Sequence, residues 1–488
     1  MRARLSLRGG WPFIAAALVL GAVAAIFHEP WRDEAQTVLV GRLPLGEMLR
    51  VARIEGVPPG IFLLMKVLDR VFGNVSLAVL AGAGYAVLLR GIFRLARELT
   101  NVRAAWITTG LLALSYPCLF EGGIVARQYG LAHGLALSGW AASLAYARTR
   151  RGHLAPLVFA SAACGVFNVH ASLLVASAIA VAVCARAMRV RSFAPLACGL
   201  ACAPGPLLAL AFALPHAERS LHMNESAALL DVRFVSVARV WRRAFFQAEG
   251  TWMLPEWPSA SLVDRLELPT FAGMAVLALF VLLRRDRKAR VFGLGWALAS
   301  AALTYTFVTR TGAHYRHLIF IALPAAAALV AIAVQLVRTR PWLGLPALAL
   351  ISPWLLLLNG LGLGTLAEDL QKPFASARSQ ATVFPPGAQL VASTGAPIAI
   401  LYYRPDVVFR AATNEGRPMR HLLPDRSFFT QVESTTLAKQ ACGDTRLGRI
   451  WTSDLYVYQE CATGLIAGQG RVEAWTWYVL DCTCVAGR

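Results

Sequence analysis

Long uncharged segments alternate with short charged ones over most of this chain. Eleven apolar segments recur, at 11–27, 71–89, 104–120, 128–147, 154–169, 171–185, 192–215, 268–283, 291–309, 318–337 and 341–367. A helix needs about 20 apolar residues to cross the hydrocarbon core, and shorter segments suffice where flanking side chains reach the interface. The pattern therefore predicts a polytopic α-helical membrane protein with about 11 transmembrane helices.

Two shorter stretches between the first two spans have different patterns. Residues 34–53 alternate apolar with charged positions and contain Pro44, which predicts an amphipathic surface helix with a break at the proline. Residues 57–68 are apolar but carry Pro58-Pro59 near their start. If they crossed the membrane, every later charged loop would change sides, so we expect a juxtamembrane helix on the outer face.

The arginines and lysines indicate the orientation of the spans. They gather at alternate junctions, in the clusters Arg2/Arg4/Arg8, Arg90/Arg94/Arg97/Arg103, Arg148/Arg150/Arg151, Arg186/Arg189/Arg191, Arg284/Arg285/Arg287/Lys288/Arg290 and Arg338/Arg340. Cytoplasmic loops carry such an excess of positive charge. The first cluster precedes an apolar run without a convincing small-residue cleavage site, which predicts an uncleaved first span with a cytoplasmic N-terminus. Eleven crossings then place the chain after residue 367 outside.

Composition agrees with this architecture. The 488 residues are 57% hydrophobic and 15% charged, and the mean hydropathy is +0.55. The net charge of +20 would suggest nucleic acid in a soluble protein. Because the arginines lie mainly in short loops between apolar runs, they are better explained as topology signals. We expect a multi-pass protein of the inner (plasma) membrane that contacts membrane lipids and no nucleic acid.

The last part of the chain has the pattern of a small extracytoplasmic α/β domain, residues 368–488. Strand-like runs occur at 389–393, 407–409, 449–451, 456–458 and 474–480. This domain follows a transmembrane domain, residues 1–367, whose outer loops span 28–70 and 215–267. The aromatic and charged residues of the loop 215–267 fit either a sugar cleft or the headgroup belt.

Four cysteines lie in this tail, namely Cys442, Cys461, Cys482 and Cys484. An even number in an outward domain predicts one or two disulfides in an oxidising compartment. A Cys-x-Cys metal site is the alternative, and it has less support because no histidine falls in the last 60 residues.

An acidic motif follows the first span directly. In His28-Glu29-Pro30-Trp31-Arg32-Asp33-Glu34-Ala35-Gln36, two adjacent carboxylates stand where a membrane helix emerges into water. Acidic pairs are commonly solvated loop residues. The further spans and the outward cationic and aromatic residues favour a catalytic role for Asp33 and Glu34.

Three motifs together resemble those of the GT-C glycosyltransferases, among them the bacterial relatives of protein O-mannosyltransferases and of the aminoarabinose transferase of lipid A. They are the acidic motif, Glu55-Gly56-Val57-Pro58-Pro59, and Ala126-Arg127-Gln128-Tyr129-Gly130 after the third span. The resemblance covers roughly residues 11–320. One position departs from the pattern, because relatives often have His where Val57 stands. A metal or acceptor contact through that histidine is therefore in doubt here.

The resemblance implies transfer of a sugar from a polyprenyl-phosphate donor to an envelope acceptor, whether lipid, polysaccharide or protein, on the outer face. An acceptor hydroxyl has a pKa far above neutrality, so a carboxylate must accept its proton as the new bond forms. A single displacement would invert the anomeric centre, and the leaving phosphate needs cationic stabilisation. The family motif assigns the base to Asp33, with Glu34 orienting it or contacting the acceptor. The two adjacent residues could exchange these roles.

Substrate-binding candidates lie at the outer ends of later spans. Arg127 with Tyr129, Arg316 with His317, and His170 are the candidates for a phosphate clamp, and Glu55 is a further outer acid. Each has a structural alternative: arginines at span ends also reach lipid headgroups, His170 could be a satisfied buried residue, and Glu55 could be structural.

Metal dependence has no signature, because no His-Glu-x-x-His or comparable ligand spacing occurs. The resemblance leaves a divalent cation near Asp33 open. Two rival functions also remain. A lipid-linked glycan transporter or flippase would place charges within spans and show repeats, which are not found here. A non-catalytic envelope assembly protein would tolerate the loss of Asp33 and Glu34.

Overall fold

A computed structural model describes residues 11–28, 32–148, 154–225, 241–242, 244–246, 265–274, 287–306, 315–371, 381–392, 398–404, 406–411, 434–452, 459–467 and 476–487. The chain divides into two compact units. Unit 1 comprises Met1–Ala24, Ala52–Ile61 and Ala78–Ala367, and unit 2 comprises Ala25–Val51, Phe62–Leu77 and Glu368–Arg488. Unit 2 therefore combines the tail with two segments of the predicted first outer loop.

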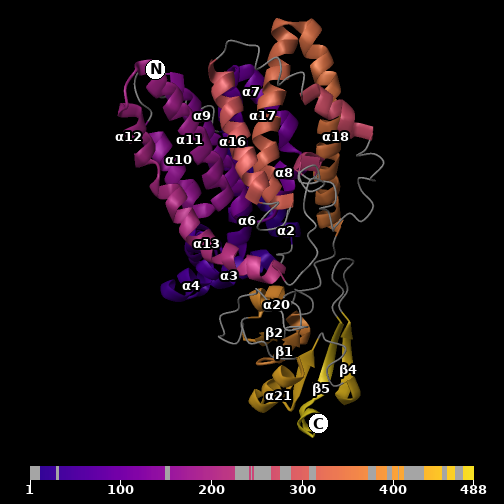
Figure 1. Ribbon diagram of the computed structural model, residues 1–488. Helices are drawn as coiled ribbons and strands as arrows, with labels where there is room; N and C mark the ends of the chain where they lie inside the picture. Colours follow the sequence, from indigo (N-terminus) through magenta and orange to yellow (C-terminus); the bar gives the residue numbers. More distant parts are fainter. Residues whose placement is uncertain are drawn as a thin grey trace. The chain divides into compact units, whose positions relative to one another are not determined.

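Unit 1 is a helical bundle (Figure 1). Its helices are α2 (Trp11–Phe27), α6 (Ser76–Leu99), α7 (Val102–Ala113), α8 (Tyr116–Leu119), the π-helix η2 (Phe120–Ile124), α9 (Gln128–Arg148), α10 (Leu154–Phe167), α11 (Val169–Val190), α12 (Ala194–Ala201), α13 (Pro204–Glu225), α16 (Arg287–Thr306), α17 (Tyr315–Thr339) and α18 (Pro341–Gln371). Helix α11 packs against α9, α10 and α16, and α17 packs against α7. Helix α11 is thus a central element of the bundle.

Four stretches of the described chain are long and apolar enough to cross a membrane. They are Gly60–Leu99, Val169–Val190, Leu318–Thr339 and Pro341–Ala367, and the bent pair α12–α13 would add a fifth. Trp11–Ile26, Val102–Ala113 and Leu154–Phe167 are shorter apolar helices. Several membrane-capable helices are therefore present, whereas the number eleven remains a prediction.

Helix α6 differs from the sequence-based segment 71–89. It begins at Ser76 and continues to Leu99, so Arg90, Arg94 and Arg97 are helical rather than part of a loop. A helix can extend past the apolar core because long arginine side chains direct their charge back toward water.

Glycines allow α6 and α9 to approach closely. A Cβ added at Gly91 would lie 2.5 Å from the carbonyl oxygen of Gly134, and one added at Gly134 would clash with the backbone of Val87. Small residues of this kind let membrane helices pack backbone against backbone. The contact fixes the start of α9 relative to α6.

Charged side chains join several helices of unit 1 at one end. Arg148 at the end of α9 pairs with Glu98 of α6 (3.4 Å), and Lys288 of α16 donates to the carbonyl oxygen of Glu98 (2.7 Å). Arg189 of α11 donates to the carbonyl oxygen of Arg148 (2.5 Å). These residues come from three of the arginine-rich junctions and from the end of α6. The structure thus places those junctions on the same side of the bundle, as the charge pattern predicts.

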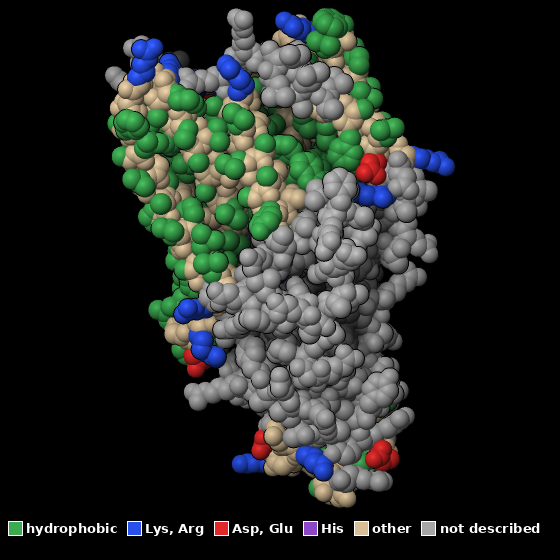
Figure 2. Space-filling view, viewed as in Figure 1, with side chains coloured by type: hydrophobic (Ala, Val, Ile, Leu, Met, Phe, Trp, Pro, Cys, Tyr) green, Lys and Arg blue, Asp and Glu red, His purple; other side chains and the backbone are tan. Residues whose placement is uncertain are grey.

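On the face that Figure 2 shows, apolar side chains cover much of the coloured surface of the bundle. Phe159, Met188, Leu200 and Leu207 are 63–75% exposed, and Phe193 is 84% exposed. Water-facing surfaces of soluble proteins rarely expose large contiguous apolar patches, so this surface fits contact with lipid.

Unit 2 is built on a five-stranded mixed sheet of order β2-β1-β3-β5-β4. The strands are β1 (Gln389–Ala392), β2 (Val408–Ala411), β3 (Arg449–Thr452), β4 (Ala462–Ala467) and β5 (Thr476–Asp481). Strand β1 pairs in parallel with β2 and β3, and β5 pairs antiparallel with β3 and β4. Four of the strand-like runs of the sequence form strands; the run 456–458 lies outside the described residues, and β4 was not expected.

Helices and two disulfides complete unit 2. The helices are α3 (Arg32–Arg42), α4 (Leu45–Glu55, which continues into unit 1), α5 (Gly60–Phe72, which begins there), the 3₁₀-helix η1 (Gly73–Val75), α20 (Ile398–Tyr403), α21 (Ser434–Asp444), the 3₁₀-helix η6 (Gln459–Cys461) and α22 (Cys482–Ala486). Cys442 bonds to Cys482 and Cys461 bonds to Cys484. The disulfides confirm the sequence-based expectation and use all four cysteines that a Cys-x-Cys metal site would need.

The stretch 34–53 breaks at Pro44, as predicted, but α3 is not a surface helix. Ala35 and Leu39 are at most 5% exposed and belong to an apolar cluster with Phe384, Leu390 and Trp451. The prediction was wrong for α3 because its polar positions are also buried, including Glu34 at 0% exposure and Thr37 at 2%. The tail of the chain supplies the covering surface, which lies far away in sequence.

Candidate functional site

The acidic motif forms a buried pair at the start of α3. Nε2 of His28 lies 2.9 Å and 3.1 Å from the two carboxylate oxygens of Glu34. Both side chains are nearly inaccessible, at 4% and 0%. A buried carboxylate requires hydrogen-bonding partners, and the imidazole of His28 is one of them. Sequence reasoning selected Glu34 but missed His28 as its partner.

Asp33 stands beside Glu34 in the first turn of α3, and its side chain lies outside the described residues. The amino end of a helix carries partial positive charge, which stabilises a nearby carboxylate anion. Both acids of the motif lie at the amino end of α3.

Helix α3 is fixed at its other end by α5. Arg42 forms two hydrogen bonds to the carboxylate of Asp69, at 2.8 Å and 2.9 Å. Lys66 donates to the carbonyl oxygens of Gly41 and Leu43 at the end of α3. The hydrogen bonds that Arg42 donates to Asp69 raise the pKa of Arg42 above its usual value. These contacts hold the helix that carries the acidic motif.

A second group of candidate residues lies in unit 1, at the starts of α9, α11 and α17. This is the end of the bundle away from Glu98 and Arg148. The guanidinium carbon of Arg127 lies 5.6 Å from the ring centre of Tyr129. His133, one turn farther along α9, stacks on Phe320 of α17 with ring centres 3.8 Å apart. The ring of His170 lies 5.9 Å from that of Phe320. Ring contacts thus connect Arg127 and Tyr129, through His133 and Phe320, to His170. The phosphate clamp stays a prediction.

His133 and Gln128 each carry a buried polar atom that has no hydrogen-bond partner among the described residues. These atoms are Nε2 of His133 and Oε1 of Gln128, in side chains that are 3% and 4% exposed overall. Buried polar atoms are normally satisfied, so each points to a ligand or water. Sequence reasoning missed His133, because a single polar residue within an apolar run gives no distinctive signal. Gln128 stood in the quoted motif around Arg127 but was given no role.

A π-helical turn leads into this group. In η2, Glu121 is fully buried and accepts a hydrogen bond from the hydroxyl of Tyr116 (3.2 Å). Single π-helical turns are frequent at functional sites because they redirect side chains. Glu121 comes shortly before Arg127 in the chain, so this turn directs the chain toward the start of α9.

The remaining predicted residues are less informative. Arg316 and His317 lie in the first turn of α17, one turn before Phe320, but their side chains lie outside the described residues. Glu55 ends α4 and is partly buried. Within the described part of the chain, no three His, Cys, Asp or Glu side chains gather in a way that could hold a metal ion.

Comparison with solved structures defines the fold. The structure of ArnT from Cupriavidus metallidurans, a lipid A aminoarabinose transferase, matches in its apo state with a TM-score of 0.51 and 15% identity, over 98% of each chain. The same protein bound to undecaprenyl phosphate matches with a TM-score of 0.50 and 15% identity, over 97% of this chain and 98% of that one. The chain has the GT-C fold.

An oligosaccharyltransferase from Archaeoglobus fulgidus, tethered to an acceptor peptide, is also similar, with 13% identity and a TM-score of 0.49. That match covers 95% of this chain and 74% of the archaeal one. No family model matches the sequence, and no curated protein does so. Assignment to the GT-C fold therefore rests on the two ArnT structures, and the chemistry must be argued from this chain's own residues.

Proposed function

We propose that this protein is a membrane glycosyltransferase that moves a sugar from a polyprenyl-phosphate donor to an acceptor in the cell envelope. The C. metallidurans ArnT structure that shares the fold contains undecaprenyl phosphate. The acceptor is a lipid, a polysaccharide or a protein on the outer face of an inner membrane, with the N-terminus in the cytoplasm.

One observation carries the proposal most directly. Arg127, Tyr129 and His170 meet at one end of the helical bundle, whereas Glu98, Arg148 and Lys288 join at the other. The positive-inside rule assigns the second, arginine-rich end to the cytoplasm. Arg127 and the histidines then belong to the outer end, where a membrane-anchored donor would present its phosphate.

The phosphate clamp follows from this placement. Arg127 offers a delocalised cation with several N–H donors, which suits phosphate oxygens. Oε1 of Gln128 and Nε2 of His133 lack partners among the described residues. Both atoms are acceptors, because Nδ1 of His133 donates to the carbonyl oxygen of Tyr129, so they suit hydroxyl groups of the donor sugar. As the bond between sugar and phosphate breaks, negative charge grows on the phosphate, so Arg127 stabilises the transition state more than the bound donor. Arg316 and His317, in the first turn of α17, are proposed as further phosphate contacts.

The general base is assigned to Asp33. Glu34 is buried and both its oxygens lie near Nε2 of His28, so its carboxylate is occupied. We assign Glu34 the role of holding the start of α3. Asp33 then accepts the proton of the acceptor hydroxyl while that oxygen attacks the anomeric carbon, and the phosphate leaves with the bonding electrons. A single displacement inverts the anomeric centre.

The test compares Asp33→Asn and Glu34→Gln in the purified protein in lipid nanodiscs. Release of polyprenyl phosphate is measured with a panel of polyprenyl-phosphate sugars and extracted envelope acceptors. Removing a general base costs roughly 10²- to 10⁴-fold in kcat, so Asp33→Asn should lose that much while KM for the donor changes little. Glu47→Gln, a carboxylate in the same outer region, is the matched control and should retain activity.

Each alternative has a distinct outcome. If Glu34→Gln alone abolishes turnover in a folded protein, the chemistry stands and the base is Glu34. If the wild type turns over a donor and both variants match it, the acidic motif is structural and the proposed mechanism is wrong. Donor movement across the bilayer without sugar transfer would instead support a transporter.

A further inference from the structure

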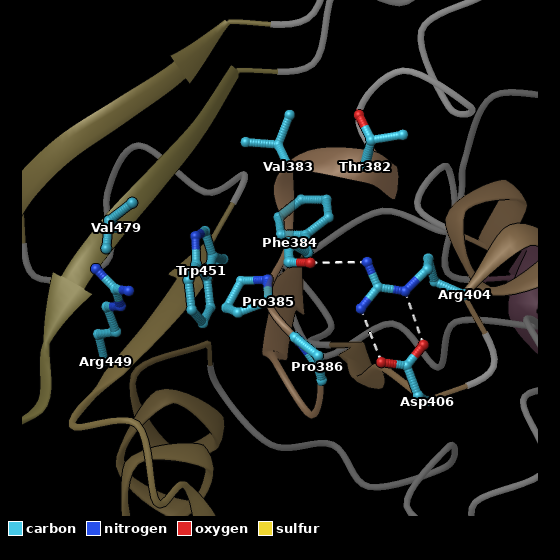
Figure 3. A pocket seen from close by; sticks show the side chains of 10 residues that line it. All are labelled: Thr382, Val383, Phe384, Pro385, Pro386, Arg404, Asp406, Arg449, Trp451 and Val479. Atoms are coloured by element: carbon cyan, nitrogen blue, oxygen red, sulfur yellow. Dashed lines mark hydrogen bonds and ion pairs between the residues drawn. The ribbon is translucent and has the colours of Figure 1, made fainter.

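Unit 2 contains an open cavity of about 740 Å³ that the proposed transfer reaction does not use. Figure 3 shows its lining, with Arg404 and Asp406 on one side, Pro385 and Pro386 between, and Trp451 and Arg449 on the other. Its volume lies within the roughly 300–1,000 Å³ that small-ligand sites usually have. The residues come from the segment after α18, the end of α20, and strand β3.

One wall of the cavity is a rigid polar surface. Arg404 donates two hydrogen bonds to the carboxylate of Asp406, each 2.8 Å long. It also donates to the carbonyl oxygens of Ala381 and Phe384, at 2.8 Å and 2.7 Å. Asp406 is 43% exposed, so its carboxylate still faces solvent. The hydrogen bonds from Arg404 lower the pKa of Asp406 to about 2, and this wall presents a fixed, ionised acceptor.

The opposite wall presents a cation. Arg449 is exposed at the start of β3, with its guanidinium carbon 5.6 Å from the ring centre of Trp451. Within the residues that the structure describes, no carboxylate pairs with Arg449. The ring contacts the guanidinium through its face, and such a cation–π contact leaves the N–H donors of Arg449 available to a ligand. Between the two walls, Pro385 and the half-exposed Val383 supply apolar surface.

This combination matches a sugar better than a peptide. A pyranose has an apolar C–H face and a rim of hydroxyl groups, which need an apolar surface and fixed acceptors and donors. A peptide that binds by strand addition needs a free sheet edge. Arg449 and Trp451 lie on β3, which is paired on both sides by β1 and β5, so this strand offers none.

We propose that this cavity binds an acidic saccharide, a glycan unit that carries a carboxylate. The carboxylate of the sugar binds Arg449, its hydroxyl groups donate to Asp406, and its C–H face lies on Pro385 and Val383. Unit 2 is thereby a carbohydrate-binding module for a uronic-acid-containing glycan. The proposal concerns binding alone and does not rest on the transferase activity.

The experiment uses the full-length protein in nanodiscs and a hyaluronan hexasaccharide, in which glucuronic acid alternates with a neutral sugar. Isothermal titration calorimetry gives the Kd for wild type, Arg449→Gln and Arg446→Gln. Arg446 is an exposed arginine three residues away, outside the cavity lining. Because an arginine–carboxylate contact is among the stronger hydrogen-bonded pairs, Arg449→Gln should weaken binding roughly tenfold or more, and Arg446→Gln should leave it unchanged.

Two further ligands test whether the cavity instead binds a neutral saccharide or an acidic peptide. Maltohexaose, which lacks a carboxylate, should bind at least about tenfold more weakly than hyaluronan, on the same charge argument. Hexaglutamate tests an acidic peptide and should not compete. Lack of hyaluronan binding to the wild type, equal loss in both arginine variants, or competition by hexaglutamate would each overturn the proposal. Loss of transfer activity in Asp33→Asn leaves all of these readouts unaffected.

Discussion

At the scale of single residues, the contact between His28 and Glu34 is the most specific feature of the acidic motif. The spacing of six residues places the histidine at the end of α2 and the glutamate in the first turn of α3. Their contact therefore closes the connection between two helices. A local pair of this kind fixes the first turn of α3, in which Asp33 stands.

The His28 variants test this positioning role. His28→Ala removes a partner of a buried carboxylate, which should lower the free energy of unfolding by about 1–3 kcal/mol. We also expect kcat to fall about tenfold with little change in KM for the donor, because the acid is misplaced while the phosphate clamp is intact. His28→Gln keeps a side-chain N–H donor and should recover part of the activity. Equal loss in both variants would show that His28 acts in another way.

Asp406 gives a pH-dependent prediction. Its pKa is lowered by Arg404 to about 2, below the value of about 3.9 expected in an unfolded chain. At pH values above the unfolded pKa, the ionised Asp406 therefore makes its full contribution to the stability of the folded state. This contribution is lost as the pH falls from about 4 to about 2, where the carboxylate becomes protonated. Hydrogen exchange of the amide of Gly387, which donates to Asp406, should report the change.

The control for this prediction is Asp406→Asn, which cannot ionise. In that variant, the protection of Gly387 should be lower at neutral pH and should no longer depend on pH in this acidic range. A wild-type profile that stays flat between about pH 5 and about pH 2 would show that solvent screens the pair almost completely, as happens for many exposed ion pairs.

At the scale of elements, the close crossing of α6 and α9 supports the start of α9, where Arg127 and Tyr129 lie. Gly134→Val would insert a branched side chain against the backbone of Val87. Overpacking of this kind typically costs about 1–3 kcal/mol. The thermal unfolding temperature of the protein in nanodiscs should fall, and KM for the donor should rise because the clamp shifts. Gly110→Val, at a position with open space around it, is the matched control and should behave like wild type.

Most helices could be predicted from the sequence, whereas some contacts could not. Long apolar runs identify helices such as α11 and α17, because the absence of charge persists over many residues. Strand β4 was missed because its sequence, Ala-Thr-Gly-Leu-Ile-Ala, has few β-branched residues and no alternation. The extent of α6 was misjudged because charge was taken to end a helix.

The candidate site could be predicted only in part, for a related reason. Asp33, Glu34 and Arg127 have recognisable neighbours in the chain, so a motif reveals them. His133 has none: its importance comes from Phe320, which is nearly 190 residues away in the sequence and stacks on it. Side chains that acquire a role through such distant contacts become visible only in the folded chain.

At the scale of the whole molecule, the two disulfides are a large stabilising contribution to unit 2. Cys442 and Cys482 are 40 residues apart. Closing a loop of this length lowers the conformational entropy of the unfolded chain, which stabilises the folded state by about 4 kcal/mol. The double variant Cys442→Ser/Cys482→Ser should become sensitive to limited proteolysis within residues 381–487 at temperatures at which the wild type resists. Cys184→Ser, which replaces an exposed free cysteine of α11, should retain wild-type resistance.

A reducing agent provides an independent check. If the disulfides stabilise unit 2, dithiothreitol should make the wild type at least as protease-sensitive as the double variant, because the double variant keeps the Cys461–Cys484 bond. In the double variant, dithiothreitol should act only through that remaining bond. Unchanged resistance in the reduced wild type would show that the apolar clusters of unit 2 suffice without the disulfides.

Unit 2 combines segments from near both ends of the chain, which affects when it can fold during synthesis. Leu39 of α3 packs in one cluster with Ala381 and Trp451, yet Leu39 and Ala381 are about 340 residues apart. At roughly 5–20 residues per second of synthesis, the apolar face of α3 waits on the order of 20 to 70 s for its partners. A nascent chain of this protein therefore presents an unfinished surface until translation is almost complete, and we expect chaperones to occupy α3 during that interval.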